Sequence, residues 1–327
     1  MVSDKDFLKF EEGLFRSHFE KYIEFKRGKS EKVARSTIIR LRMLNHDLNN
    51  YGVLKISDEM IEDLLSAEKS VSETTRQCRI SDLRQFSEFL NILGIESASV
   101  DPKYSKRIQV KFRPYIFTED ELNRMVYCAD HLPSGRRSNE HVKVYPVIIR
   151  ILIGTGMRIG EVIALRISDI DTDNGVIKAV NCKNNVSRYI PMSDSLGEVL
   201  LTYINYHFYE SIDSPLFISP YTQQAYSYDA MKYMFKQICI NAGVYLSNGK
   251  TPNIHSVRHT FCTRSLSKML STGLNLYTAV PILSAFVGHV NLQDTERYIH
   301  FTEQDYQEFI QKESRLRWLI PEVSSYE

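Results

Sequence analysis

Apolar residues recur every three or four positions through the first 94 residues, which is the spacing of amphipathic helices. Glycine and serine interrupt this pattern, and these residues end helices or cap their first turns. The pattern therefore predicts four helices, at residues 7–25, 33–52, 57–68 and 72–94, with breaks at Gly28 and Ser30. A compact helical module with short loops suits binding better than catalysis.

The pattern changes after residue 94. Residues 95–113 are polar and basic without periodicity, and we interpret them as a linker. Thr118, with Glu121 three positions later, is a capping box that starts the next helix. Residues 145–170 are strongly apolar and are interrupted at Gly154 and Gly156.

A change from helical to alternating pattern then predicts a β-hairpin. Two short β-like runs, residues 175–180 and 186–192, flank the polar turn "NCKNN". Helical patterns resume beyond it. The predicted fold class is mainly α with a small antiparallel β-sheet in the second of two domains, residues 1–94 and 114–327, joined by the linker 95–113.

Composition narrows the function only by exclusion. The chain is 43% hydrophobic and 25% charged, which is typical of a globular protein with a sizeable core. Its charged N-terminus lacks the apolar core of a signal peptide, and no apolar run is long enough to span a membrane, so we expect a cytoplasmic protein. The five cysteines are scattered and suggest neither disulfides nor a zinc site. The phosphate-binding motif GxxxxGK[ST] does not occur, so the sequence gives no indication of ATP binding.

The formal net charge of +1 does not indicate nucleic acid, but basic residues cluster locally. Residues 26–42 hold seven basic residues and one acidic residue, and residues 103–113 hold five basic residues and no acidic one. One interpretation is a pair of solvated faces; the other is contact with DNA phosphates. The candidate DNA-contacting residues are Lys26, Arg27, Lys29, Lys32, Arg35, Lys106 and Arg107.

The second domain carries six polar residues in positions that suggest chemistry. They are Arg158 after the glycine break, Lys183 at the hairpin tip, His255 and Arg258 one helical turn apart, His289, and Tyr298. His289 and Tyr298 are nine residues apart and cannot share one face of a straight helix. They can converge if Gly288 ends one helix and Asn291 or Asp294 caps the next.

The motifs around these residues resemble the tyrosine recombinase, or phage integrase, family. They are "TGMRIGEVIAL", "HSVRHTF", "VGH" and "TERYIH", in that order, and they cover about residues 113–305. Each residue alone has an ordinary structural explanation, such as a surface ion pair between Arg158 and Glu161. Six such residues in the family's order are not explained in that way.

The resemblance implies DNA strand exchange through a covalent intermediate, in which Tyr298 attacks and remains on the 3′-phosphate. It implies that Arg158, Arg258 and His289 stabilise the phosphoryl oxygens. His255 would exchange a proton with the tyrosine or donate to the phosphate, and Lys183 would protonate the leaving 5′-oxygen. No cofactor or metal is expected. We expect Glu161 to brace Arg158 or a neighbouring residue, and we expect His259 to orient the site.

The resemblance also implies a two-domain DNA clamp with a helical core-binding domain at residues 1–94. The expected partners are double-stranded DNA with inverted-repeat core sites, a homo-tetramer on two duplexes, and accessory directionality factors, in the nucleoid and not at a membrane. Integration or excision of a mobile element is the favoured role. Chromosome dimer resolution, DNA inversion, a type IB topoisomerase and a non-catalytic DNA-binding protein are the alternatives.

Overall fold

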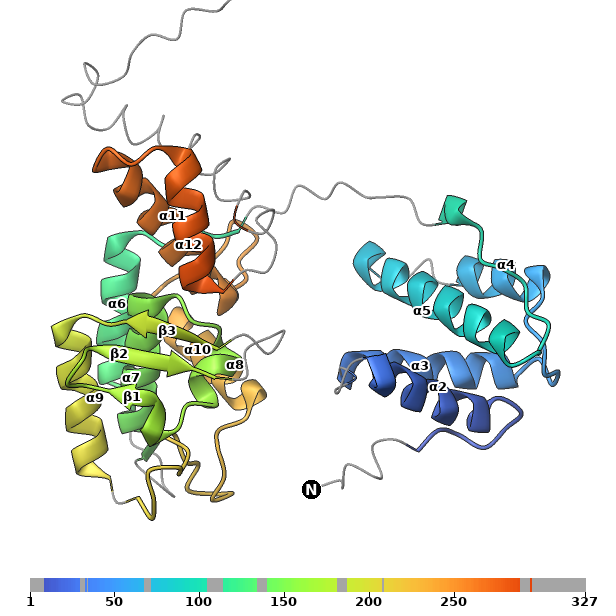
Figure 1. Cartoon of the computed structure of the whole chain (residues 1–327), viewed down its shortest axis with the longest axis horizontal. Helices are drawn as coiled ribbons and strands as arrows, with labels where there is room; N and C mark the ends of the chain where they lie inside the picture. The colour runs from blue at the N-terminus through green and yellow to red at the C-terminus, as the bar shows by residue number, and fades with distance from the viewer. Residues whose placement is uncertain are drawn as a thin grey trace, which may run out of the picture. The chain divides into compact units, whose positions relative to one another are not determined.

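The computed structural model describes residues 9–29, 33, 35–67, 72–104, 114–133, 140–180, 187–207, 209–288 and 295. The chain divides into two compact units, Met1–Lys111 and Phe112–Glu327, which we call the N-terminal and C-terminal units (Figure 1). Most elements are helices, and one small antiparallel sheet lies in the C-terminal unit, which confirms the predicted fold class. None of the helices in the described ranges has the length and apolar character that a membrane crossing requires.

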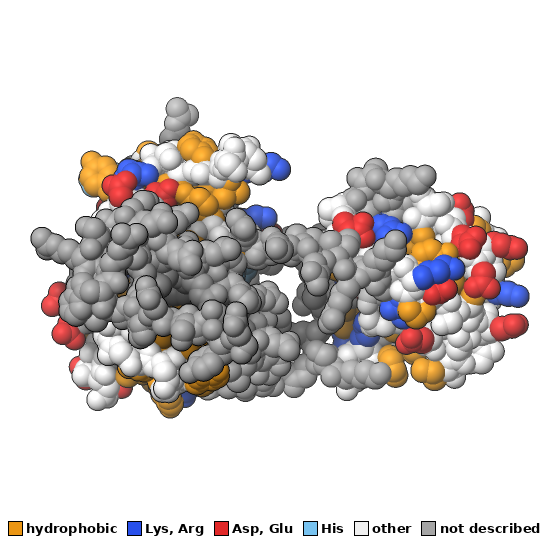
Figure 2. All heavy atoms as spheres, turned by 90° about the horizontal axis from the view of Figure 1, so that it is seen from above, with side chains coloured by type: hydrophobic (Ala, Val, Ile, Leu, Met, Phe, Trp, Pro, Cys, Tyr) orange, Lys and Arg blue, Asp and Glu red, His pale blue; other side chains and the backbone are white. Residues whose placement is uncertain are grey.

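The N-terminal unit is built from helices around an aromatic core. The helices are α2 (Arg16–Lys29), α3 (Arg35–Asn49), α4 (Asp58–Ala67) and α5 (Glu73–Ile92). Phe19 from α2 stacks on Phe86 from α5 with ring centroids 3.8 Å apart. Burial of large aromatic side chains supplies much of the stabilisation of so small a unit. On the face seen in Figure 2, acidic and basic side chains of this unit are mixed with apolar ones.

The first helix differs from its predicted bounds at both ends. Among residues 7–25, residues 9–15 lie outside the helix, and α2 begins only at Arg16. Phe10 and Phe15 precede the helix and enter the core from a non-helical segment, so their burial does not mark a helix face. At the other end, Gly28 lies inside α2 and does not break it. It is the penultimate residue of the helix, which ends at Lys29.

Residues 95–104 pack against the N-terminal unit. Ser97 forms a parallel β-bridge with Ile56, and Val100 is buried in the same core as α2 and α5. The short 3₁₀ helix η2 (Pro102–Tyr104) follows. The division between the two units falls after Lys111, within the segment that we predicted as a linker.

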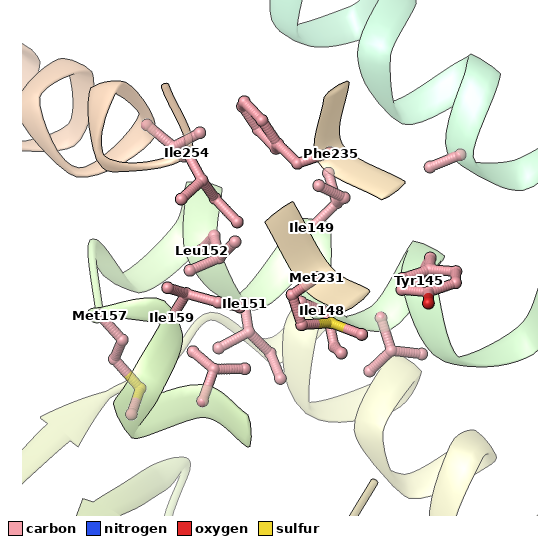
Figure 3. Close-up of a cluster of buried hydrophobic side chains, with 14 of the residues drawn as sticks. Tyr145, Ile148, Ile149, Ile151, Leu152, Met157, Ile159, Met231, Phe235 and Ile254 are labelled. Carbon is pink, nitrogen blue, oxygen red and sulfur yellow. The ribbon is translucent and has the colours of Figure 1, made fainter. Parts of the chain in front are cut away.

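The C-terminal unit is larger and its core is mainly aliphatic. Its helices are α6 (Glu119–Asp130), α7 (Glu140–Thr155), α8 (Ile159–Ile163), α9 (Asp194–Tyr206), α10 (Tyr228–Asn241), α11 (His255–Ser271) and α12 (Leu276–Val287), with the 3₁₀ turn η3 (Ile167–Asp169). Figure 3 shows Ile148, Ile151 and Leu152 of α7 packed between α8, α10 and the residue that precedes α11. The capping box of Thr118 and Glu121 begins α6 as predicted.

The sheet has the order β1-β2-β3, all antiparallel: β1 (Ile170–Asp171), β2 (Val176–Ala179) and β3 (Arg188–Pro191). Alternation places Ile177, Ala179 and Ile190 in the core, and Ile177 pairs with Ile190. The predicted hairpin is confirmed, and β1 adds a strand that the pattern did not reveal. Residues 181–186, which include Lys183, lie outside the described residues.

Candidate active site

The site lies where the turn that follows α7 contacts α11. Helix α7 continues through Gly154, contrary to the predicted interruption there, and stops at Gly156, whose φ is +61°. A Cβ at Gly156 would lie 2.3 Å from the ring of Phe261 on α11. Only glycine satisfies both the left-handed backbone and this close approach. The turn therefore places Arg158, two residues later, beside α11.

Arg158 is the N-cap of α8 and is held by Glu161. The Glu161 carboxylate accepts hydrogen bonds from the backbone N–H of Arg158 at 3.0 Å and from its Nη1 at 2.9 Å. The Arg158 side chain retains 25% exposure, whereas the Glu161 side chain retains 7%. Glu161 thus fixes the arginine from behind while part of the guanidinium group faces solvent, in agreement with the bracing role that we predicted.

Arg258 lies on the buried face of α11. Its Nη1 donates to the carbonyl of Gly156 at 2.9 Å, and its Nη2 donates to the carbonyl of Val287 at 2.6 Å. One guanidinium group therefore joins the turn before Arg158 to the end of α12. Figure 1 shows α11 and α12 side by side.

His255 is the first residue of α11. Its backbone N–H donates to Oδ1 of Asn253 at 3.1 Å, which supplies a partner at the helix start. Burial lowers the pKa of the His255 imidazole, and the positive charges of Arg258 and Arg158 lower it further. At neutral pH the ring is therefore neutral, which is the form that accepts a proton.

A cleft of about 570 Å³ brings Arg158 and His255 to one surface, whereas Arg258 is buried and is not among the lining residues. The lining of the cleft includes Arg158 and His255 together with Lys178 of β2 and Tyr228 of α10. Such a concave site with convergent polar groups is the usual form of an active site. Lys178 and Tyr228 were missed in the sequence because neither lies in a motif. Only the strand register and the start of α10 bring them to the cleft.

Half of the predicted catalytic residues can be placed. Arg158, His255 and Arg258 come together from α8 and α11, as described. Lys183, His289 and Tyr298 lie outside the described residues. The structure does describe Gly288, the C-cap of α12, whose φ of +68° ends that helix directly before His289, as predicted. Among the described residues, no group of three His, Cys, Asp or Glu side chains is arranged to bind a metal ion.

The candidate DNA-contacting residues are less fully placed. Lys26 Nζ donates to Oε1 of Gln85 at 2.8 Å and lies 5.0 Å from the centroid of the Tyr22 ring. Arg27 is exposed on the same helix. The side chains of Lys29 and Arg35, and the whole of Lys32, Lys106 and Arg107, lie outside the described residues.

The lowered pKa of His255 makes stability depend on pH in a defined direction. Its folded pKa lies below its unfolded value, so protons favour the unfolded state and stability falls as pH decreases below about 6.5. We expect the melting temperature of wild type to fall more between pH 7 and pH 5 than that of His255→Gln.

His46 provides a control of opposite sign. Its hydrogen bond to the Glu11 carboxylate raises the pKa of His46, so its contribution is present at low pH and is lost as pH rises through the folded pKa. His46→Gln should therefore be less stable than wild type at a pH below the folded pKa of His46, and this difference should disappear at higher pH. If the melting temperatures of wild type and His255→Gln fall by the same amount between pH 7 and pH 5, the pKa of His255 is not depressed.

A family model and a known relative each match more than half of this chain. A model of the phage integrase family matches residues 116–305. Tyrosine recombinase XerC of Pediococcus pentosaceus is 26% identical over 314 residues, which cover 90% of this chain and 96% of that protein.

Among solved structures, the XerH site-specific recombinase bound to palindromic difH substrate aligns with a TM-score of 0.66 at 18% identity, over 92% of this chain and 84% of that chain. The Tn1549 transposon integrase bound to transposon right-end DNA aligns with a TM-score of 0.61 at 19% identity, over 88% of this chain and 98% of that chain. At these identities the structures show a shared fold.

Proposed function

The chain belongs to the phage integrase family of tyrosine recombinases, which are DNA breaking-rejoining enzymes, and we propose that it is a site-specific recombinase that works through a 3′-phosphotyrosine intermediate. The observation that carries the proposal is that Arg158 and His255 line one cleft, while the buried Arg258 lies near enough to His255 for its charge to lower the pKa of that imidazole. Two guanidinium groups beside a neutral imidazole suit a phosphodiester that gains negative charge during attack.

In the proposed reaction the Tyr298 hydroxyl oxygen forms a bond to phosphorus as the bond to the 5′-oxygen breaks. The tyrosine proton passes to His255, whose neutral form is suited to accept it. Lys183 supplies a proton to the departing 5′-oxygen, and His289 donates to a non-bridging oxygen beside the two arginines. A phosphotyrosine ester is close in energy to a phosphodiester, so a new 5′-hydroxyl can reverse the step without ATP.

The biological role that we propose is integration or excision of a mobile element. The enzyme would act in the cytoplasm on the nucleoid, as a homo-tetramer that clamps two duplexes at inverted-repeat core sites, with accessory factors that set direction. The N-terminal unit would serve as the core-binding domain. Resolution of chromosome dimers is the alternative.

Covalent trapping tests the function. The protein is incubated with nicked suicide duplexes that carry candidate element ends or chromosomal dimer-resolution sites, and adducts are resolved under denaturing conditions. We expect an adduct on the strand with the 3′-phosphate at an element end. Adducts confined to chromosomal sites would favour dimer resolution. Relaxation of supercoiled DNA without exchange between duplexes would favour a topoisomerase, and the absence of any adduct would contradict the proposal.

The basic cluster at the end of α2 gives a separate prediction. Replacement of Lys26, Arg27, Lys29 and Lys32 by glutamine is expected to reduce the slope of log K against log salt, because fewer phosphates are neutralised in the complex. The reduction should be about 0.9 for each phosphate that the variant leaves without a basic partner, and up to about 3–4 in all. The slope is measured by titration of labelled core-site DNA at several salt concentrations.

Arg16 is the matched control. It lies on the same helix but forms ion pairs with Glu12 and Glu20, so Arg16→Gln should leave the slope unchanged. If the four-residue variant also keeps the wild-type slope, the cluster is a solvated face and does not bind DNA.

A further inference from the structure

The C-terminal end of α12 is held by three arginines from three elements. The last carbonyls of a helix lack donors within the helix, and they carry the negative end of its dipole. Here three consecutive carbonyls receive guanidinium donors: Phe286 O from Nε of Arg188 at 2.9 Å, Val287 O from Nη2 of Arg258 at 2.6 Å, and Gly288 O from Nη2 of Arg158 at 3.4 Å. Two of these arginines are the proposed phosphate ligands. The third, Arg188, belongs to no motif.

The Arg158 side chain is 25% exposed and lines the cleft, whereas Arg258 and Arg188 direct their donors into the protein. Arg188 differs from Arg258 because its fork binds a carboxylate and not two backbone carbonyls. Its side chain is only 9% exposed. Nη2 donates to Oε2 of Glu161 at 2.8 Å and Nη1 donates to Oε1 at 3.2 Å, while Nε serves Phe286 O. A guanidinium group with its fork on a buried carboxylate is well placed to orient other groups. Arg188 is not among the residues that line the cleft with Arg158 and His255.

Glu161 connects Arg188 to the proposed phosphate ligands. Burial would raise the pKa of this carboxyl, but the hydrogen bonds and charge of Arg188, followed by those of Arg158, hold the pKa at about 2. The two arginines thus share one ionised carboxylate. Loss of Arg188 would leave that buried negative charge to Arg158 alone, and the Arg158 guanidinium would be drawn away from the cleft.

Arg188 also shapes the corner that leads to His289. A Cβ at Gly288 would lie 2.9 Å from Nη1 of Arg188 and 3.1 Å from its Cζ, in a backbone with φ of +68°. The backbone at Gly288 therefore packs directly against the Arg188 side chain. A shift of Arg188 would therefore change the packing around Gly288.

We infer that Arg188 is a positioning residue for the cleavage site, one that fixes the end of α12 and the Glu161–Arg158 pair in a single arrangement. It acts through these groups and touches no substrate. This inference rests on the proposed function, because cleavage is the reaction that it serves. It also makes β3 a direct connection between the sheet and the corner before His289, across 98 positions of sequence.

The test compares Arg188→Met with Arg150→Met. Arg150 forms the same kind of fork, from Nη1 and Nη2 to the two oxygens of Asp130 at 2.7 Å, but it joins α7 to α6 away from the cleft. Binding of core-site DNA should stay within about twofold of wild type for both variants. Cleavage per folded molecule should fall about 10- to 100-fold for Arg188→Met, as a displaced catalytic geometry predicts, and should be unchanged for Arg150→Met.

A substrate with sulfur in place of the bridging 5′-oxygen separates two routes. Sulfur leaves without a proton, so it should restore cleavage by Lys183→Ala. It should not restore Arg188→Met, because the inferred defect lies at the phosphate-binding groups. Rescue of Arg188→Met would overturn the inference. It would show that the substitution impairs protonation of the leaving 5′-oxygen by Lys183. Arg188→Lys keeps the charge without the fork and should retain an intermediate rate, which decides the matter if the methionine variant is unstable.

Hydrogen exchange provides a readout that does not depend on activity. The amides of residues 284–288 should exchange faster in Arg188→Met than in wild type, and at the wild-type rate in Arg150→Met. Unchanged exchange together with unchanged cleavage would overturn the inference. If wild type itself forms no adduct, the proposed function fails, and the exchange data alone decide whether Arg188 positions the end of α12.

Discussion

Tyr298→Phe is expected to abolish covalent attachment to DNA while leaving duplex binding within about twofold of wild type. The substitution removes one hydroxyl group and keeps the aromatic ring, so packing and charge are preserved. Without the nucleophile, the remaining groups can bind the phosphate but have no oxygen to transfer it to. The measurement is adduct formation on a nicked suicide substrate, with binding followed separately by titration.

The control for this prediction is Tyr306→Phe, which removes the next tyrosine along the chain and should leave adduct formation unchanged. An adduct formed by Tyr298→Phe but not by Tyr306→Phe would assign the nucleophile to Tyr306. Loss of binding in Tyr298→Phe would show that the hydroxyl contributes to recognition and not only to chemistry.

Arg258→Ala is expected to lose both activity and stability. Its guanidinium group is the donor to the carbonyls of Gly156 and Val287, and a buried carbonyl without a donor costs about 1–3 kcal/mol. Loss of a fixed charge at the developing phosphoryl oxygens should lower the cleavage rate by a further 10²- to 10³-fold, roughly. Thermal unfolding gives the first effect, and single-turnover cleavage at a temperature where the variant is folded gives the second.

Arg264→Ala separates the two effects. Arg264 lies on the same helix, and its Nη2 donates to the carbonyl of Phe117 at 3.1 Å, away from the cleft. This variant should lose some stability and retain the wild-type cleavage rate. Arg258→Lys, which keeps the charge but cannot span both carbonyls, should cleave slowly. If Arg258→Ala cleaves as fast as Arg264→Ala, Arg258 has only a structural role.

Local signals in the sequence were sufficient for much of the fold. The hairpin was evident from alternation in residues 175–192, and the end of α12 from Gly288, because both depend on short-range backbone preferences. The predicted start of α2 was wrong because Phe10 and Phe15 are buried from a non-helical segment, and their apolar side chains imitate helical periodicity. The predicted break at Gly154 was also wrong: of the two glycines at the end of α7, Gly156 has a positive φ and Gly154 does not.

The site was predictable only as far as its motifs extend. Arg158, His255 and Arg258 were identified by motif, and the structure gives the contacts that bring them together. Arg188 was not identified, because its importance depends on tertiary contacts with Phe286 and Glu161 that no local pattern encodes. A basic residue at the start of a short strand normally suggests a solvated charge, and only the strand register turns this one inward.

The most direct test of the central claim is the identity of the amino acid joined to DNA. Wild-type protein is trapped on a suicide substrate, the adduct is digested with protease and nuclease, and the nucleotide-bearing peptide is sequenced by mass spectrometry. The proposed function predicts a single modified residue, Tyr298, that carries the 3′-phosphate. Modification of Tyr306 or another residue, attachment through a 5′-phosphate, or the absence of any adduct would contradict it.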